Sequence, residues 1–310
     1  MMIDCPKKPL RLGTRASPLA MAQAHMVRAQ LLAVHSWAED LIEICPVVAS
    51  GDKILDRALA EVGGKALWTK ELDQWLISGE IDFSVHSMKD VETHRPTEFT
   101  IAAMLERADV RDRLIGAQSI AALPQGARVG TSAPRRHAQL LAIRPDLVIC
   151  LFRGNVQTRL AKLAAGEAQA TLLAAAGLER LSMDDVGVAI AVEEMLPAPS
   201  QGAIGIETLV SNYDVTRWIS AINHAPTFTC VNAERGLLAG LSGDCRSPVA
   251  GLAVIKDTHI WLRCEIYSGD GQYKETGEIM FSTDDDEAPA RLAAKLLERA
   301  HPAVRASFGA

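Results

Sequence analysis

Short runs of apolar residues alternate along most of the chain with longer segments in which apolar positions recur every three or four residues. The short runs predict strands, and they cover residues 10–13, 41–48, 81–86, 127–130, 147–151 and 170–174. The periodic segments predict helices, and they cover residues 18–34, 65–78, 133–143, 155–165 and 213–222. Strands that alternate with helices are typical of α/β units around mostly parallel sheets.

The last third of the chain has a different order of elements. A helical pattern over 223–241 is followed by predicted strands at 248–255 and 260–267 and by a closing helix at 287–300. Strands followed by a helix predict a small α+β domain. The preceding residues 196–202 are rich in proline, serine and glycine, which predicts a connector.

Composition narrows the class of protein. The chain has 310 residues, enough for two or three domains, with 48% hydrophobic and 23% charged residues, as in ordinary globular proteins. A net charge of −6 argues against a general nucleic-acid surface, and no apolar stretch is long enough to span a membrane. We therefore expect a small-molecule partner, with no nucleic acid and no membrane.

Six cysteines lie apart from one another, at positions 5, 45, 150, 230, 245 and 264. Because none belongs to a CxxC pair, the sequence predicts neither a metal site nor a dithiol redox motif. Scattered cysteines suit a reducing compartment, and the first residues lack the charged-then-apolar order of a secretory signal. We expect a cytoplasmic protein.

Three predicted strand-to-helix turns carry hydroxyl residues and arginines. They contain Arg15 and Ser17 in the first turn, Thr131, Ser132, Arg135 and Arg136 in the second, and Arg153, Asn155 and Arg159 in the third. Any one turn is compatible with an ordinary capped helix, since the free amides of a helix start favour either a cap or a bound anion. Loops at the carboxyl ends of parallel strands converge on one cleft. Together the five arginines predict a polyanionic ligand.

The predicted strand 81–86 ends in a polar turn with Lys89 beside Asp90. Such a pair is common on surfaces, but its place at a strand end, together with the arginines, favours a site. There Asp90 would be an isolated anion that stays ionised and stabilises a cation as it develops. His86, in contrast, is expected to be a packed, hydrogen-bonded structural residue.

Two further features concern a loop and a thiol. The glycine pair at 63–64 and Lys65 form either the edge of a lid or an ordinary loop. Cys245 lies in a Gly-Asp turn outside any apolar strand, which favours exposure compared with Cys150 or Cys264. It is a candidate for the covalent attachment of a group.

In this order, the segments resemble the porphobilinogen deaminase family over nearly the whole chain. The most specific are His-Ser-Met-Lys-Asp at 86–90, Arg-Gly-Asn-x-x-Thr-Arg at 153–159 and Gly-Asp-Cys at 243–245. Further matches cover 14–20, 63–65, 130–132, 135–136 and 201–207.

The resemblance implies a transferase of porphyrin and heme biosynthesis, a hydroxymethylbilane synthase. Such an enzyme adds four porphobilinogens head to tail to a dipyrromethane primer, releases ammonia, and frees hydroxymethylbilane by hydrolysis. The resemblance implies that Cys245 holds this cofactor as a thioether and that Asp90 is the catalytic carboxylate. The implied cofactor-binding residues are Lys89, Thr131, Ser132, Arg135, Arg136, Arg153 and Gly154. The implied substrate-binding residues are Arg15, Ser17, Lys65, Arg153, Arg159 and Gln201.

The resemblance also implies two α/β lobes similar to periplasmic solute-binding proteins, with an active-site cleft between them, and a small α+β C-terminal domain. The implied domains are 1–105 plus 201–222, 106–200, and 223–310, which carries the cofactor cysteine. The first domain would be discontinuous, and the family suggests a monomer.

Some positions depart from the family pattern. Ala133 and Pro134 replace a hydroxyl residue and a leucine, which removes one donor and places Pro134 in the first helical turn. Glu61, Trp68 and Arg246 stand in place of a lysine, a phenylalanine and a glutamine. Two alternatives stay open: a non-catalytic two-lobed solute-binding protein for a polycarboxylate, and a relative that has lost activity. The first explains the arginines but not the cysteine.

Overall fold

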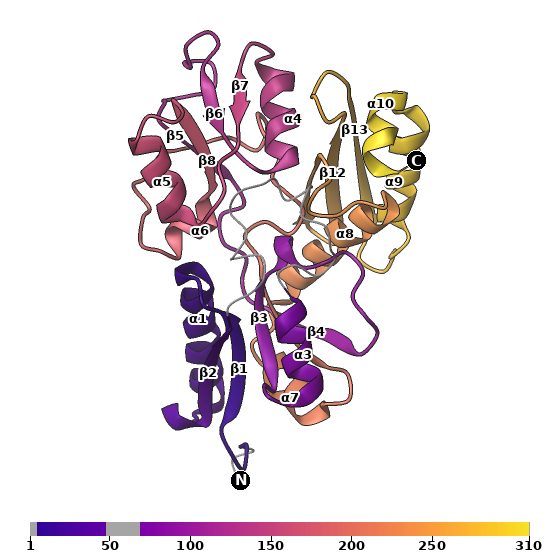
Figure 1. Cartoon of the computed structure of the whole chain (residues 1–310). Coiled ribbons are helices and arrows are strands. Elements are labelled where there is room, and N and C mark those ends of the chain that lie inside the picture. Colours follow the sequence, from indigo (N-terminus) through magenta and orange to yellow (C-terminus); the bar gives the residue numbers. More distant parts are fainter. Residues whose placement is uncertain (1–4, 48–68, 310) are drawn as a thin grey trace. The chain divides into compact units, whose positions relative to one another are not determined.

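The computed structural model describes residues 5–47 and 69–309 (Figure 1). These residues form two compact units, each with its own sheets and cores. The first unit contains residues 5–47, 69–107 and 203–228, and the second contains 108–202 and 229–309. The chain therefore leaves the first unit after residue 107 and returns to it at residue 203.

The first unit is built on a five-stranded mixed sheet with the order β2-β1-β3-β10-β4. Its strands are β1 (Leu10–Arg15), β2 (Ile42–Val47), β3 (Phe83–Ser87), β4 (Phe99–Met104) and β10 (Ile204–Leu209). β1 pairs in parallel with β2 and β3, whereas β10 is antiparallel to β3 and β4. The described helical segments are α1 (Pro18–His35), α3 (Lys70–Ser78), α7 (Tyr213–Ser220) and the short 3₁₀ turns η1 (Glu39–Leu41) and η3 (Met88–Asp90).

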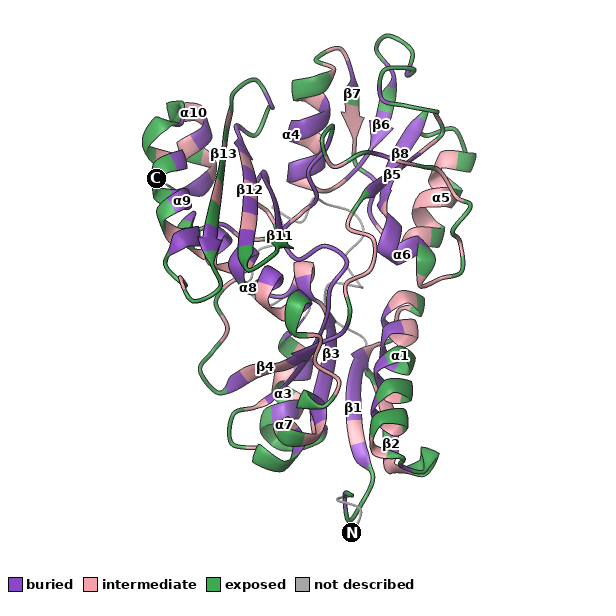
Figure 2. Cartoon of the chain, turned by 180° about the vertical axis from the view of Figure 1, so that it is seen from behind, coloured by how far each residue is buried: buried purple, intermediate pink, exposed green. Residues whose placement is uncertain are grey.

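Helix α1 begins and ends where its local sequence dictates. Ser17 accepts a hydrogen bond from a first-turn amide at 3.3 Å, and Pro18 takes the first helical position, where an N–H would have no helical partner. The helix ends at Ser36, whose backbone is left-handed. Its buried side, with Val27, packs in one core with strand residues such as Leu12, while the opposite side is exposed (Figure 2).

The second unit contains a five-stranded sheet with a corresponding pattern, β7-β6-β8-β5-β9. Its strands are β5 (Asp112–Ile115), β6 (Arg128–Gly130), β7 (Val148–Cys150), β8 (Ala170–Ala174) and β9 (Val188–Ala189). β6 pairs in parallel with β7 and β8, whereas β5 is antiparallel to β8 and β9. The helices that follow β6, β7 and β8 are α4 (Pro134–Ile143), α5 (Val156–Ala164) and α6 (Ala175–Glu179).

The second unit also contains an antiparallel sheet with the order β11-β12-β13. Its strands are β11 (Val249–Lys256), β12 (His259–Tyr267) and β13 (Lys274–Ser282). Around it in the chain lie α8 (Ala225–Gly240), α9 (Ala288–Arg299), α10 (Pro302–Arg305) and the 3₁₀ turn η4 (Ala306–Phe308). Leu237 of α8, Leu262 of β12 and Leu296 of α9 share one core, so helices cover one face of this sheet.

The α/β class and the small α+β C-terminal part are confirmed. Each predicted strand and helix has a counterpart, although parts of the segments 41–48 and 65–78 lie outside the described residues. The expectation of mostly parallel sheets is wrong, because two of the four pairings in each five-stranded sheet are antiparallel. The division into three domains stays a prediction. No helix within the described part of the chain has the length and apolarity to cross a membrane.

Candidate functional site

Two loops of the first unit carry predicted site residues at the same edge of its sheet. β1 and β3 are adjacent and parallel, so the segments that follow them start from neighbouring carboxyl ends. Arg15 ends β1 and is half-buried, and Ser17 caps α1 two residues later. Lys89 and Asp90 belong to η3, directly after β3, and both are half-buried.

The turn that carries Asp90 is fixed by its buried neighbours. Met88 is fully buried, and its N–H donates to the Ala203 carbonyl at 3.1 Å. Val91 is also buried, and its N–H donates to the Met88 carbonyl at 3.3 Å. Lys89 and Asp90 therefore lie between two buried apolar anchors and are themselves half-buried.

His86 is a structural residue of β3, as predicted. Its side chain is 5% exposed, and Nε2 lies 2.8 Å from Ser84 Oγ and 3.2 Å from Glu207 Oε2. Both partners belong to the same sheet, since β3 pairs with β10.

In the second unit, the turn after β6 is held by Thr131. Its backbone N–H donates to the Cys150 carbonyl at 2.9 Å, and its buried hydroxyl oxygen accepts from the Ala133 N–H at 3.2 Å. Pro134 takes the first position of α4, as predicted, and no side chain caps that helix start. The Thr131 hydroxyl thus accepts a hydrogen bond from the amide of the residue that precedes the helix. Ser132, the next residue in the turn, is half-buried.

The two arginines of α4 are buried and share one carboxylate, that of Asp112 on β5. Arg135 Nη2 lies 2.7 Å from one oxygen and Arg136 Nη2 lies 2.8 Å from the other. Arg135 also donates to the Leu196 carbonyl and Arg136 to the Leu172 carbonyl, both at 2.9 Å. Burial favours protonation of Asp112, but the charges and hydrogen bonds of the two guanidinium groups outweigh it and hold its pKa well below the ordinary value.

Asp112 was not among the predicted site residues. It lies in the highly charged stretch 109–113, which is typical of a surface, and nothing in that stretch marks it as buried. Gln201, which lies much later in the sequence of the same unit, also contacts Asp112. Its side-chain amide donates to the Asp112 carboxylate at 2.9 Å and to the Val110 carbonyl at 2.7 Å. The structure thus places Gln201 in the same buried cluster as Arg135, and its role toward substrate stays a prediction.

The turn after β7 lies beside the turn after β6, because these strands are adjacent and parallel. Arg153 is 5% exposed, and Gly154 after it has a φ of 107°. Asn155 caps α5, as predicted, by accepting from the Thr158 N–H at 2.9 Å. Arg159 Nε donates to the Gly154 carbonyl at 3.0 Å, which ties the helix back to the turn.

Cys245 is exposed in the turn between α8 and β11, whereas Cys150 is half-buried and Cys264 is buried. This confirms the expected order of exposure. The turn is built by Asp244, whose carboxylate accepts from the Arg246 N–H at 2.8 Å and from its guanidinium at 2.7 Å. The exposed thiol therefore lies on a turn that the Asp244 side chain holds.

The predicted site residues are divided between the two units. The first unit carries Arg15, Ser17, Lys89 and Asp90, and the second carries Thr131, Ser132, Arg135, Arg136, Arg153, Gly154, Arg159, Gln201 and Cys245. Lys65, Glu61 and Trp68 lie outside the described residues. Within residues 5–47 and 69–309, no cluster of three or more histidine, cysteine, aspartate or glutamate side chains is arranged to hold a metal ion.

Family models and curated relatives match nearly the whole chain. Residues 10–217 match the model described as porphobilinogen deaminase, dipyromethane cofactor binding domain, and residues 228–299 match porphobilinogen deaminase, C-terminal domain. Porphobilinogen deaminase of Sphingopyxis alaskensis is 57% identical over 309 residues, which cover 98% of each chain. The Paracoccus denitrificans protein of the same name is 48% identical over 269 residues and 86% of each chain. The chloroplastic one of Pisum sativum is 45% identical over 285 residues, 89% of this chain and 77% of that one.

Solved structures similar to this chain include periplasmic binding domains. The VFT2 domain of Bordetella pertussis BvgS has a TM-score of 0.38 at 15% identity, over 69% of this chain and 85% of that one. A TRAP periplasmic solute binding protein from Desulfovibrio salexigens has a TM-score of 0.41 at 10% identity, over 70% of this chain and 73% of that one. Scores this low carry no argument, and the fold class rests on the sheets of the chain itself.

Proposed function

Because the chain belongs to the porphobilinogen deaminase family, we propose that it condenses four porphobilinogens head to tail on a covalently held dipyrromethane, and then frees hydroxymethylbilane by hydrolysis. It is a transferase of porphyrin and heme biosynthesis with a dipyrromethane cofactor-binding domain. The observation that carries the assignment of the site is the exposed thiol of Cys245, which belongs to the same unit as two of the three arginine-bearing turns, those after β6 and β7.

The residues of the second unit fit a group with carboxylate side chains. Arg135 and Arg136 each have a buried Nε–H without a hydrogen-bond partner among the described residues. Their two positive charges face the single negative charge of Asp112, so the cluster has one cation in excess. Such donors favour acetate and propionate groups. When bound, the dipyrromethane supplies the free pyrrole carbon to which the first substrate is joined, and each later substrate is joined to the unit added before it.

We assign the remaining cofactor contacts to Lys89, Thr131, Ser132, Arg153 and Gly154, with Cys245 as the thioether sulfur. The two turns that carry most of these residues lie side by side at the ends of β6 and β7, which supports a shared ligand. Substrate carboxylates would be held by Arg15, Ser17, Arg153, Arg159 and Gln201, with Lys65 as a further cation.

Asp90 is the group we assign to the chemistry. Loss of ammonia from porphobilinogen breaks the bond between the aminomethyl carbon and its protonated nitrogen. The bonding electrons leave with the ammonia, so the positive charge passes from that nitrogen to the pyrrole ring. A carboxylate close to the pyrrole nitrogen stabilises this charge electrostatically. Support comes from the position of Asp90, half-buried on a turn that Met88 and Val91 anchor.

We further propose that the protein works as a cytoplasmic monomer that binds no nucleic acid. A net charge of −6 supports the last point, since a phosphate backbone is attracted by cations. None of the six cysteines, all of which lie in the described part of the chain, forms a disulfide bond, which suits a reducing compartment. The alternative of a non-catalytic solute-binding protein rests on fold likeness alone, and the family match does not support it.

The intact mass of the denatured protein tests the assignment of Cys245. Wild-type protein made in a host that supplies porphobilinogen is expected to exceed its sequence mass by two linked pyrrole units. Cys245→Ala is expected to lack this excess, whereas Cys5→Ala is a matched control because Cys5 is the other exposed cysteine. An excess that persists in Cys245→Ala would place the cofactor on another thiol. Wild-type protein with no excess and no ammonia release from porphobilinogen would contradict the proposed function.

A further inference from the structure

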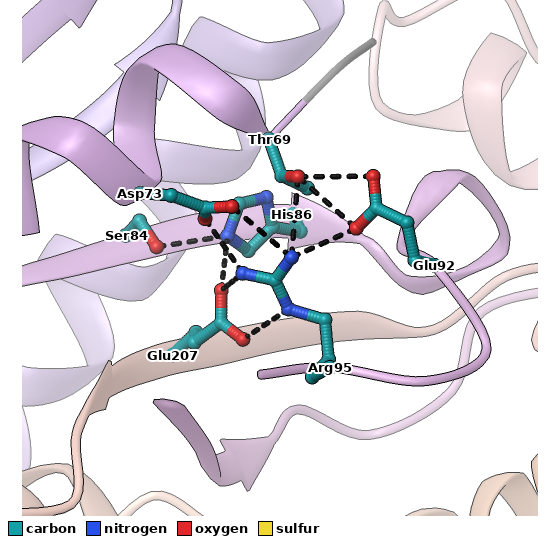
Figure 3. Close-up of polar contacts among 7 residues, drawn as sticks. All are labelled: Thr69, Asp73, Ser84, His86, Glu92, Arg95 and Glu207. Atoms are coloured by element: carbon teal, nitrogen blue, oxygen red, sulfur yellow. Dashed lines mark hydrogen bonds and ion pairs between the residues drawn. The ribbon is translucent and has the colours of Figure 1, made fainter. Parts of the chain in front are cut away.

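Directly after the turn that carries Asp90, the chain enters a buried cluster of charged and polar side chains that the proposed reaction does not use. Figure 3 shows its members, which are Thr69, Asp73, Ser84, His86, Glu92, Arg95 and Glu207. We call these seven residues the Arg95 cluster. They come from α3 and the residue before it, from β3 and β10, and from the loop 91–98 that connects η3 to β4.

Arg95 lies at the centre of the cluster and donates through all three of its nitrogens. Nε and Nη2 donate to the two oxygens of Glu207 at 2.8 and 2.9 Å. Nη2 and Nη1 donate to the two oxygens of Asp73 at 2.6 and 3.2 Å. Nη1 also donates to Glu92 at 2.8 Å and to the Thr69 hydroxyl at 3.2 Å. Forked pairs of this kind fix direction as well as distance, and the Arg95 side chain is only 9% exposed.

The negative charges of the cluster require a cation at the place that Arg95 occupies. Three carboxylates face one guanidinium, so the cluster carries an excess of negative charge whether His86 is protonated or neutral. Burial raises the pKa of Asp73, whereas the hydrogen bonds and charges of His86 and Arg95 outweigh burial and lower the pKa of Glu207. A displaced guanidinium would leave buried like charges facing one another without a cation, which is strongly unfavourable.

The cluster fixes the carboxyl side of the Asp90 turn, as a buried anchor fixes the amino side. Before Asp90, the Met88 N–H donates to a carbonyl just ahead of β10 at 3.1 Å. After it, Glu92 accepts from the Thr69 hydroxyl at 3.0 Å through either oxygen and from Arg95. Asp90 thus lies two residues from each anchor: the first is bonded to the residue before β10, and the second to the residue before α3 and to Arg95.

We propose that Arg95 is a positioning residue for Asp90, which clamps the loop 91–98 onto α3 and β10 and so sets where the Asp90 carboxylate lies. The inference rests on the proposed function, in which Asp90 stabilises the cationic substrate. Arg95 does not touch substrate and acts through the backbone of the turn. A displacement of a catalytic group by about 1 Å can lower a rate by about 100-fold, so the clamp is expected to matter for kcat.

The Arg95→Lys variant tests the clamp, because lysine keeps the charge but cannot make forked pairs. We expect a folded protein that carries its cofactor by intact mass and whose kcat for ammonia release falls by about 10-fold. Arg11→Lys is the matched control: it breaks the forked pair between Arg11 and Asp82, at the opposite end of β3, and is expected to change kcat by less than about 2-fold. A kcat for Arg95→Lys within 2-fold of wild type would overturn the inference.

A double-variant comparison separates positioning from a general loss of structure. In an Asp90→Glu background the carboxylate is already displaced, so Arg95→Lys is expected to lower single-turnover ammonia release by less than about 2-fold further. A purely structural arginine would instead add its full loss to that of Asp90→Glu. A further loss of about 10-fold in this background would therefore contradict a role that acts through Asp90.

Glu92→Gln provides a milder test if Arg95→Lys does not fold. The Glu92 side chain is 23% exposed, so its neutralisation leaves the core intact, and kcat is expected to fall by about 3-fold. An unchanged kcat in this variant would overturn the inference. Wild-type protein that releases no ammonia from porphobilinogen contradicts the proposed function, whereas an active wild type with an equally active Arg95→Lys contradicts the positioning role alone.

Discussion

One buried carboxylate holds two of the arginines that were expected to bind ligand. The Asp112 side chain is fully buried, and its oxygens accept from Arg135 at 2.7 Å and from Arg136 at 2.8 Å. A guanidinium loses its hydration on burial, so each cation needs a partner that stays in place through every state of the site. Asp112 is that permanent partner, and because it carries one negative charge against two guanidinium groups, one positive charge stays in excess.

Asp112→Asn is expected to lower the free energy of unfolding by about 3–5 kcal/mol, because it leaves two buried guanidinium groups without an anion. Urea denaturation of the purified protein measures the change. Asp146→Asn is a matched control: its pair with Arg144 is equally short at 2.7 Å, but the Asp146 side chain is 30% exposed, so the change is expected to be small. Equal losses in the two variants would contradict the role of Asp112.

At the scale of elements, helix starts were predictable because their signals are local. Ser17 caps α1 and Asn155 caps α5 with bonds to amides three residues along, and Pro134 opens α4. The exposure of Cys245 followed in the same way from its place in a Gly-Asp turn. Each of these predictions needed only a few neighbouring residues.

Other features depend on partners far along the chain, and the sequence pattern did not reveal them. β5 and β10 were not predicted, although each becomes an antiparallel strand inside a five-stranded sheet. Arg95 is buried in a cluster whose carboxylates include that of Glu207, 112 residues away. Asp112 likewise lies in a charged stretch and finds its arginines more than 20 residues later. A locally charged sequence is typical of an exposed segment, but in both places the fold produces burial.

The turn between β7 and α5 depends on a glycine. Gly154 has a φ of 107°, and a Cβ on it would lie 2.8 Å from Thr158 Cβ. Gly154→Ala is expected to lower the free energy of unfolding by about 2–4 kcal/mol, because a strained backbone and a steric clash add. Gly166→Ala is the matched control, since Gly166 also has a positive φ but open space around it, and about 1 kcal/mol is expected.

Thermal or urea unfolding of both glycine variants gives this comparison. The intact mass of Gly154→Ala should also show a smaller fraction of protein with cofactor, because the same turn carries Arg153 and Arg159. Similar stability of the two variants would mean that the turn relaxes without cost.

At the scale of the whole molecule, each unit buries a carboxylate whose pKa its cations hold below the ordinary value. These are Glu207 in the first unit and Asp112 in the second. A carboxyl with a lowered folded pKa contributes its full stability above its pKa in the unfolded chain, about 4, and loses it as the pH falls toward the folded value.

Both units are therefore expected to lose stability below about pH 4 and to keep these contributions at pH 6. Urea denaturation at pH 6 and pH 3 measures the loss. Asp112→Asn lacks one of the two carboxyl groups. The difference between its free energy of unfolding and that of wild type is therefore expected to be smaller at pH 3 than at pH 6. A deficit of constant size across this range would show that the Asp112 carboxylate is not the group that titrates.

The path of the chain through the two units has a consequence for synthesis on the ribosome. Among the described strands, β4 pairs only with β10, so a nascent chain of 200 residues cannot yet add β4 to its sheet. The sheet of β5 to β9 lies wholly within residues 112–189 and can close first. The usual order of domain folding, from the N-terminus onward, is then reversed. The Asp90 turn is anchored by contacts to Ala203 and Glu207, which are synthesised more than 100 residues later, so it is among the last parts of the first unit to form.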